Sequence, residues 1–220
     1  MNIVKGLITK EILNLKAYKK NFLLILLFVL VFGLFSEKNS MFITIYIPIC
    51  FGMLAINGFY YDGISNAERY LLTLPLSRKE MVRSKYIYVL LVDLIAFILS
   101  VGFSSIVLYI KDSAAVDLID IVSSTAGTSI AMLIVQILQI PILIKFGYEK
   151  GRYIQSLFFL LCLGIGAGFL MVGSRDSAVN MSGLVIWLEQ YGVYLLTLLI
   201  IFGLLLSYHI SCKIFQKKEI

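Results

Sequence analysis

Six long apolar stretches follow one another along the chain, separated by shorter polar segments. Five of them reach the roughly 20 residues that a helix needs to cross the hydrocarbon core of a bilayer. The first is shorter, and we expect Lys19 and Lys20 to help it reach across by snorkelling toward the membrane surface. The predicted spans are residues 22–35, 41–61, 86–110, 125–146, 153–172 and 191–212.

The segment before the first span, residues 1–20, has a helical period. Its apolar residues Ile3, Val4, Leu7, Ile8, Ile12 and Leu15 share one face, and polar residues lie largely opposite. This pattern predicts an interfacial helix on the inner membrane surface, with its lysines near lipid headgroups. The alternative is an amphipathic helix that packs on the chain's own loops. A cleaved signal peptide is another interpretation of the N-terminus, because a basic region precedes a short apolar run. The run "FSEKNS" after that apolar run lacks the small-x-small pattern of a signal-peptide cleavage site, so we expect the N-terminal segment to be retained.

Composition agrees with a membrane protein. Of the 220 residues, 60% are hydrophobic and 15% charged, whereas a soluble domain carries roughly 25% charged residues. Cys50, Cys162 and Cys212 all fall within predicted spans and are odd in number, so they indicate small core residues rather than a disulfide framework or a metal site.

The distribution of Lys and Arg predicts the orientation. Of the 19 Lys and Arg, 16 lie in residues 1–21, 62–85, 145–152 and 213–220, and the remaining three are Lys38, Lys111 and Arg175. Because cytoplasmic segments retain positive charge, both termini are expected in the cytoplasm. The net charge of +6 then follows from this topology and the anionic inner leaflet, and nucleic acid need not be invoked as a partner.

The polar insert between the second and third predicted spans, residues 62–85, includes the run "AERYLLTLPLSRKEMVRSKY". Ser65 with Glu68 and Ser77 with Glu80 form two capping-box patterns, so two helix starts are predicted. Pro75 ends the first helix. We therefore expect a short cytoplasmic helix over 66–72 and a second helix from Arg78 into the third span. Such a helix suits docking on a soluble partner, although a simple solvated connection is the alternative.

The longest outer connection, residues 173–190, contains "SGLVIWLEQY", which predicts a short helix with Trp187 and Tyr191 at interface depth. A partly re-entrant hairpin before the last span fits this pattern. No internal repeat or linker interrupts the chain, so residues 1–220 are predicted to form a single transmembrane domain.

Polar residues within the spans are candidates for a substrate path. Thr125, Ser129, Gln136 and Gln139 recur near helical spacing and form a polar stripe in the fourth span. The stripe either lines a substrate path at a dimer interface or hydrogen-bonds to sister spans. Asp93 lies in the third span, where a carboxylate is a candidate for transport, or is satisfied structurally by a neighbour.

The polar insert resembles the loop between the second and third spans of permeases of the type-two ATP-binding-cassette exporters. That family shows an acidic residue, leucines, Leu-Pro-x-Ser-Arg and a lysine entering the next span. The matching residues here are Glu68, Leu71, Leu72, Leu74, Pro75, Ser77, Arg78 and Lys85. The interfacial helix, six spans, cytoplasmic termini and outer hairpin extend the resemblance over the whole chain.

The resemblance implies that residues 66–72 are a coupling helix that seats in a separate ATPase subunit. The implied coupling residues are Glu68, Arg69, Leu71, Leu72, Pro75, Ser77, Arg78 and Lys79. It also implies two copies of the ATPase, a second permease that is identical or homologous, and a bacterial plasma membrane. Relatives of this size export bacteriocins and amphipathic peptides, which are the implied substrates.

The sequence contains no G-x-x-x-x-G-K-[ST] motif to cradle nucleotide phosphates. We therefore expect no catalysis and no cofactor bound by this chain, and ATP and Mg to be used by the partner subunit. "GIGAG", residues 164–168, is typical of close helix packing in a span.

Two other classes of protein remain as alternatives. An intramembrane enzyme would need paired catalytic groups at depth, and Asp93 is the single candidate within the spans. A stand-alone channel or polytopic scaffold would not require the capped insert.

Overall fold

The computed structural model describes residues 2–17, 20, 23–24, 26–29, 31, 40–64, 70–71, 73, 77–111, 118–173 and 182–217, and over 154–196 it describes the backbone alone. All of these residues lie in helices except Ser77 and the break at Gly147 within α6. The long helices are α1 (Asn2–Ala17), α3 (Ser40–Ile64), α5 (Arg78–Lys111), α6 (Leu118–Gly173) and α7 (Ser182–Lys217). The predicted all-α class is therefore confirmed for the described part of the chain.

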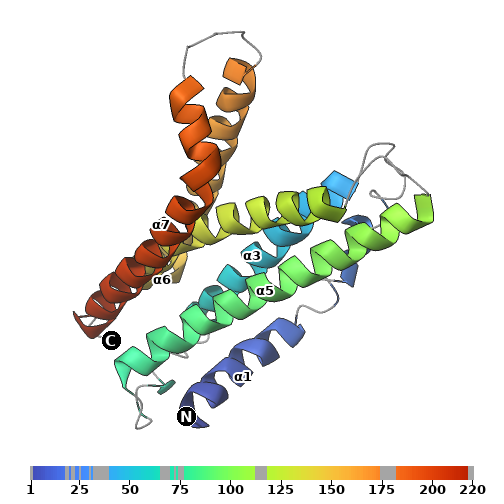
Figure 1. Cartoon of the computed structure of the whole chain (residues 1–220). Coiled ribbons are helices and arrows are strands. Elements are labelled where there is room, and N and C mark those ends of the chain that lie inside the picture. The colour runs from blue at the N-terminus through green and yellow to red at the C-terminus, as the bar shows by residue number, and fades with distance from the viewer. Residues whose placement is uncertain are drawn as a thin grey trace.

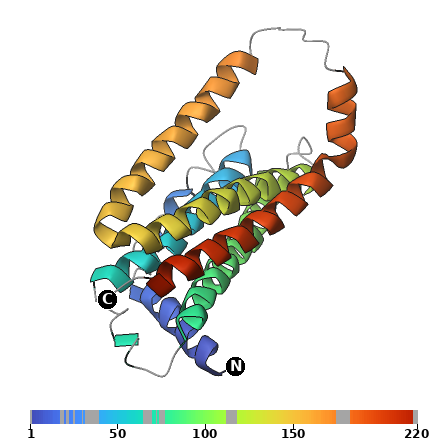
Figure 2. The same ribbon diagram turned by 90° about the vertical axis from the view of Figure 1, so that its left-hand side faces the viewer.

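Helix α3 lies at the centre of the arrangement (Figure 1). It packs against α1, α5 and α6, and α7 packs against α5 and α6. Ile43, Ile47, Phe51 and Ala55 recur every four residues along α3 and are buried, which places one continuous apolar face of α3 in the core. The second half of α6 and the first half of α7 project away from these packed helices (Figure 2).

Among the described residues, three helical segments are long and apolar enough to cross a membrane: Arg78–Ile110, Leu118–Gly147 and Thr197–Lys217. A shorter apolar helix covers Ile43–Phe59. Their outward surfaces are apolar too, which suits contact with lipid; the exposed residues on α5 and α7 include Leu90, Leu91, Leu94, Ile95, Ile98, Leu198, Leu199, Phe202, Leu205 and Leu206. Half of the first predicted span, including residues 32–35, lies outside the described residues, so six spans and the outer hairpin stay predictions.

Two helix boundaries differ from those expected. Helix α6 begins at Leu118, in a stretch predicted to be a loop up to residue 124. The hydroxyls of Ser123 and Ser124 donate to the carbonyls of Asp120 (3.0 Å) and Ile121 (3.1 Å) within the helix, so these polar residues are accommodated in it. The short helix predicted in residues 173–190 joins the last span in one helix, α7, which begins at Ser182.

The connection predicted around residues 145–152 is a single break at Gly147. Its backbone has φ 71° and ψ −177°, and helical residues precede and follow it directly. A positive φ costs glycine little because glycine has no Cβ. The chain therefore changes direction sharply at this residue (Figure 2).

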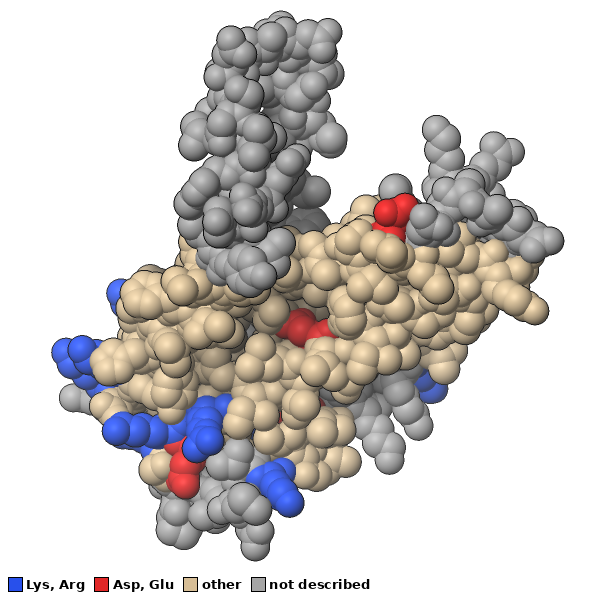
Figure 3. Space-filling view, viewed as in Figure 1, with Lys and Arg blue, Asp and Glu red and all other residues tan. Residues whose placement is uncertain are grey.

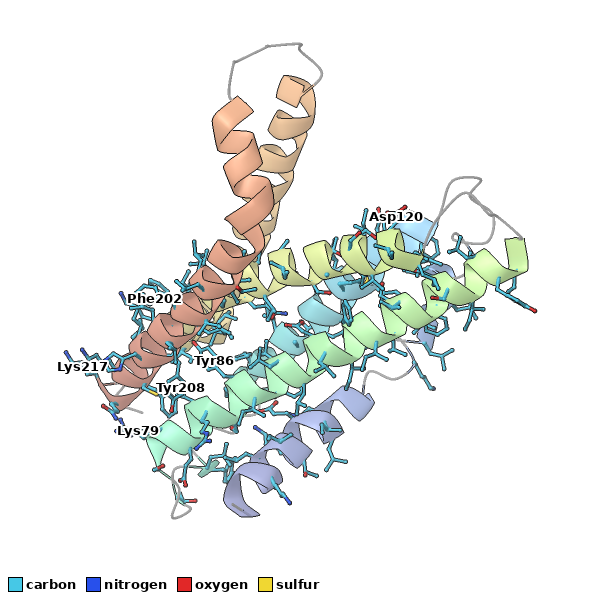
Figure 4. The ribbon with its side chains drawn as sticks, in the orientation of Figure 1. Lys79, Tyr86, Asp120, Phe202, Tyr208 and Lys217 are labelled. Carbon is cyan, nitrogen blue, oxygen red and sulfur yellow. The ribbon has the colours of Figure 1, made fainter. Side chains whose placement is uncertain are left out.

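Basic side chains gather toward one end of the packed helices, where Glu80 and Asp62 also lie. Lys79 at the start of α5 and Lys217 at the end of α7 lie at one end, and Asp120 at the start of α6 lies at the other (Figure 4). Lys and Arg side chains gather at the end that contains Lys79 and Lys217 (Figure 3). We call it the basic end. The grouping agrees with the charge pattern that predicted the orientation.

Two prolines inside helices each free a backbone carbonyl, and a neighbouring helix supplies a donor. Pro48 in α3 and Pro141 in α6 have no N–H to give to the carbonyl four residues earlier, at Thr44 and Ile137. The hydroxyl of Thr128, which also lies near carbonyls of its own helix, is 3.0 Å from the Thr44 oxygen. The hydroxyl of Ser207 donates to the Ile137 oxygen at 2.6 Å. Both prolines thus tie α6 to another helix.

The bond from Ser207 belongs to a longer chain of hydroxyl groups. Because Ser207 donates to Ile137, it accepts from the Tyr86 hydroxyl at 2.6 Å, and Tyr86 in turn accepts from Ser211 at 2.9 Å. The Tyr86 ring also meets the Tyr208 ring edge to face, with centroids 5.6 Å apart (Figure 4). These contacts join α5, α6 and α7.

Replacing Ser207 with alanine should lower stability, because the Ile137 carbonyl loses its donor in a region without water. We expect a loss of about 1–2 kcal/mol, measured by thermal unfolding in nanodiscs. Pro141→Ala restores an N–H to α6, so Ser207→Ala should cost less in that background. The control is Ser105→Ala, whose hydroxyl bonds within its own helix. Equal costs of Ser207→Ala in both backgrounds would contradict the explanation.

Candidate functional site

The predicted helix start at Ser77 is confirmed. The Ser77 N–H and hydroxyl both donate to Glu80 Oε2, at 3.0 and 2.7 Å, and the Glu80 N–H approaches Ser77 Oγ at 3.3 Å. This reciprocal pattern is a capping box, and α5 begins at the next residue, Arg78. The sequence therefore fixes where the polar insert ends and α5 starts.

Arg78 contacts the end of α7. Its Nη1 donates to the carbonyls of Phe215 (3.1 Å) and Gln216 (2.7 Å), in the last turn of α7. These carbonyls have no donor within the helix, and the helix dipole makes that end negative, so a guanidinium is favourable there. A residue expected on the ATPase-facing surface thus also holds the start of α5 against α7.

The remaining coupling residues are placed in part. Leu71 is helical and half-buried against the core, Lys79 is exposed, and Tyr70 is 74% exposed. The hydroxyl of Thr73 donates to the Tyr70 carbonyl at 2.7 Å. Glu68, Arg69, Leu72 and Pro75, together with the first capping box, lie outside the described residues, so their roles stay predictions.

An ionic cluster that the sequence analysis missed joins α1, α3 and α5 near the polar insert. Asp62, in the last turn of α3, is 1% exposed and forms ion pairs with Lys10 of α1 and Lys85 of α5. The Lys85 Nζ lies 3.0 Å from Asp62 Oδ2 and 4.5 Å from the centre of the Phe59 ring. One signal was available: Asp62 directly follows a long uncharged run, and Lys85 directly precedes the third predicted span.

Glu11 adds a second carboxyl group to this cluster. Its side chain is buried and lies 3.4 Å from Lys10 Nζ. Burial, and then the neighbouring Asp62 carboxylate, raise the pKa of Glu11. Burial alone would raise the pKa of Asp62 as well, but Lys85 and Lys10 outweigh it and lower that pKa. The cluster therefore favours a charged Asp62 with two lysine partners.

The intramembrane carboxyl of Asp93 is buried between α5 and α6. Gln136 Nε2 donates to Asp93 Oδ1 at 3.0 Å and lies 3.5 Å from the Gly52 carbonyl of α3. Asp93 Oδ2 and Gln136 Oε1 have no hydrogen-bond partner among the described residues. A Cβ on Gly52 would lie 2.5 Å from Met132 Cγ, so glycine allows α3 and α6 to approach closely here. Gln136 of α6 therefore contacts both α5 and α3 at the point where the three helices meet.

The other stripe residues lie on the packed side of α6. Thr125 is fully buried and its hydroxyl donates to the Ile121 carbonyl at 2.7 Å. Gln139 is 5% exposed, and Gln139 Oε1 and the Ser129 hydroxyl are buried without a partner among the described residues. The Gln136 contact favours hydrogen bonding between sister helices, and the role of the stripe in lining a path stays a prediction.

Among the described residues, no group of three or more His, Cys, Asp or Glu could hold a metal ion.

Comparison with known families now adds to this geometry. A family profile described as "ABC-2 family transporter protein" matches residues 6–216 of the chain. No curated protein and no solved structure matches it. The match spans nearly the whole chain, so the protein belongs to the ABC-2 transporter family. It is a multi-pass membrane protein and the membrane subunit of a transporter, and family membership implies an ATP-binding-cassette ATPase partner in general terms.

Gln136→Leu should destabilise the chain, because the variant leaves a buried Asp93 carboxyl without its amide donor. We expect a loss of about 1–3 kcal/mol, measured by thermal unfolding in nanodiscs. Removing both polar groups with Asp93→Leu/Gln136→Leu should recover much of that loss.

Gln139→Leu is the matched control for this cycle, since Gln139 lies about one turn further along α6 and its Oε1 has no hydrogen-bond partner among the described residues. Its coupling to Asp93→Leu should be smaller. If Gln136 and Gln139 couple equally to Asp93, the pair does not hold α5 and α6 together as described.

Proposed function

We propose that this protein is the permease subunit of an ATP-driven exporter and that the helix over residues 66–72 is its coupling helix. The observation that supports this most is positional. The end of α3 and the start of α5, which the polar insert joins in sequence, both lie at the basic end (Figure 1). A soluble ATPase could reach it there without entering the membrane.

The orientation follows from the same grouping of charge. The ends of α3 and α7 and the start of α5 all lie at the basic end (Figure 1), which under the positive-inside rule is the cytoplasmic end. Both termini are then cytoplasmic in a bacterial plasma membrane. This places the coupling helix on the side where ATP is available.

The mechanism that we propose uses two ATPase copies and a second permease, identical or homologous. ATP binding closes the ATPase subunits and moves the coupling helix, and α3 and α5 carry the movement into the membrane. This chain supplies the docking surface and the moving spans. ATP and Mg belong to the partner, which performs the hydrolysis.

The substrate that we propose is an amphipathic or antimicrobial-type peptide. Such a ligand can partition into the bilayer beside the broad apolar surfaces of α5 and α7. The polar groups Asp93, Gln136 and Gln139, with Thr125 and Ser129, would meet its polar face where two permeases join. Movement out of the cell is part of the same proposal.

Purification of the chain with its ATPase tests the proposal. A gentle detergent extract of the native membrane should yield an ATPase with the chain, and Glu68→Lys should remove it by reversing a charge on the coupling helix. Asp120→Lys is the matched control, because Asp120 is an exposed acidic residue at the opposite end. Wild-type chain that purifies without an ATPase would contradict the proposed function.

Arg78 and Lys79 should behave differently, although they are neighbours. Arg78→Ala removes the bonds to the α7 carbonyls, so we expect a loss of about 1 kcal/mol of stability as well as weaker ATPase binding. Lys79→Ala alters an exposed side chain and should weaken binding alone. Thermal unfolding and retention of the ATPase during purification measure the two effects. An unchanged unfolding midpoint in Arg78→Ala would refute the role of the α7 contact.

A further inference from the structure

The two helices that flank the polar insert are joined across it by a buried ion pair. Asp62 lies two residues before the end of α3, and Lys85 lies in the second turn of α5. The Lys85 Nζ approaches Asp62 Oδ2 at 3.0 Å, and Lys10 of α1 pairs with Asp62 Oδ1. One carboxylate therefore holds three helices together at the basic end.

Because these side chains are buried, the loss of one partner costs more stability than it would in a surface ion pair. The side chain of Asp62 is 1% exposed, that of Lys85 11% and that of Lys10 28%. An exposed pair contributes little because water screens both charges, whereas removing one partner of a buried pair leaves a charge without compensation. The Phe59 ring under Lys85 adds a cation–π contact that further restricts the ammonium.

Additional contacts at the same end favour a fixed geometry. Leu7 of α1 is buried in the core cluster with Val82 and Tyr86 of α5. Glu11 and Tyr88 fill the space beside Gly58, where an added Cβ would lie 3.0 Å from Glu11 Oε2. Arg78 fixes the start of α5 on α7. Both ends of the polar insert are thus attached to packed helices.

We infer that Asp62 is a positioning residue for coupling, and that Lys10, Asp62 and Lys85 form a clamp that makes α1, the end of α3 and the start of α5 move as one body. The inference rests on the proposed function, because it assigns the clamp to the transmission of movement from the coupling helix. A push on that helix then displaces α1 together with α3 and α5. Without the clamp, the same push moves the end of α3 away from the start of α5. The movement is then not transmitted to α1.

Distance measurements between spin labels on α1 and α5 test the clamp. The labels replace Lys5 and Arg83, which are exposed, in a background with Cys50, Cys162 and Cys212 changed to alanine. In the full chain in nanodiscs, we expect one narrow distance distribution. Asp62→Asn and Lys10→Gln should broaden it, whereas Asp62→Glu, which keeps the charge, should leave it narrow. The matched controls are Asp120→Asn and Lys213→Gln, both at exposed positions.

The same distance measured in the complex with the ATPase distinguishes a role in coupling from a purely structural role. In the wild-type complex, the distance should stay the same without nucleotide and after trapping with ATP and vanadate. In Asp62→Asn it should become nucleotide-dependent while the ATPase stays bound and still hydrolyses ATP. Lys10→Gln provides a second test if Asp62→Asn fails to fold.

The outcomes separate the two proposals. Asp62→Asn and Lys10→Gln distributions as narrow as the wild type, in the chain alone and in the complex, would overturn the clamp. Failure of the wild-type chain to bind an ATPase would overturn the proposed function, and the chain alone would still show whether the clamp holds the helices.

Discussion

Every backbone carbonyl within the hydrocarbon core needs a donor from the protein, and this requirement organises the contacts of α6. Pro48 and Pro141 each leave a carbonyl without its helical partner, and hydroxyls of Thr128 and Ser207 lie where they can donate. Because the donors come from neighbouring helices, a local defect in one helix becomes a link between two. The link at Pro141 continues through Tyr86, so α5, α6 and α7 share one hydrogen-bonded chain.

Charged interactions hold the basic end, and the hydroxyl chain through Tyr86 begins directly beside them, one residue after Lys85. Asp62 gathers Lys10 and Lys85, and Arg78 binds the last carbonyls of α7. These interactions surround the polar insert on both sides. Helix α1 packs against helices α3 and α5, whereas the alternative to an interfacial helix was packing on loops; its Lys5 is exposed, and the interfacial role stays a prediction.

The sequence predicted the features that depend on neighbours along the chain. The capping box at Ser77 and the start of α5 follow from residues three positions apart, and the apolar runs give α3, α5 and the first half of α6. Family resemblance from the polar insert agreed with the family match over residues 6–216. Loop boundaries were less certain because serines such as Ser123 and Ser124 also bond within helices.

Contacts between distant residues could not be predicted in the same way. The positions of Asp62 and Lys85 beside apolar runs mark the ends of predicted spans, but nothing in their spacing shows that they meet each other or Lys10. The pairing of Gln136 with Asp93 likewise depends on the rotation of α5 and α6 about their axes. The two backbone dihedral angles of Gly147 determine the direction of the second half of α6 relative to the first half. The helix beyond Gly147, residues 148–173, is about 39 Å long at 1.5 Å per residue, so turning that one hinge by about 10° swings its far tip by about 7 Å.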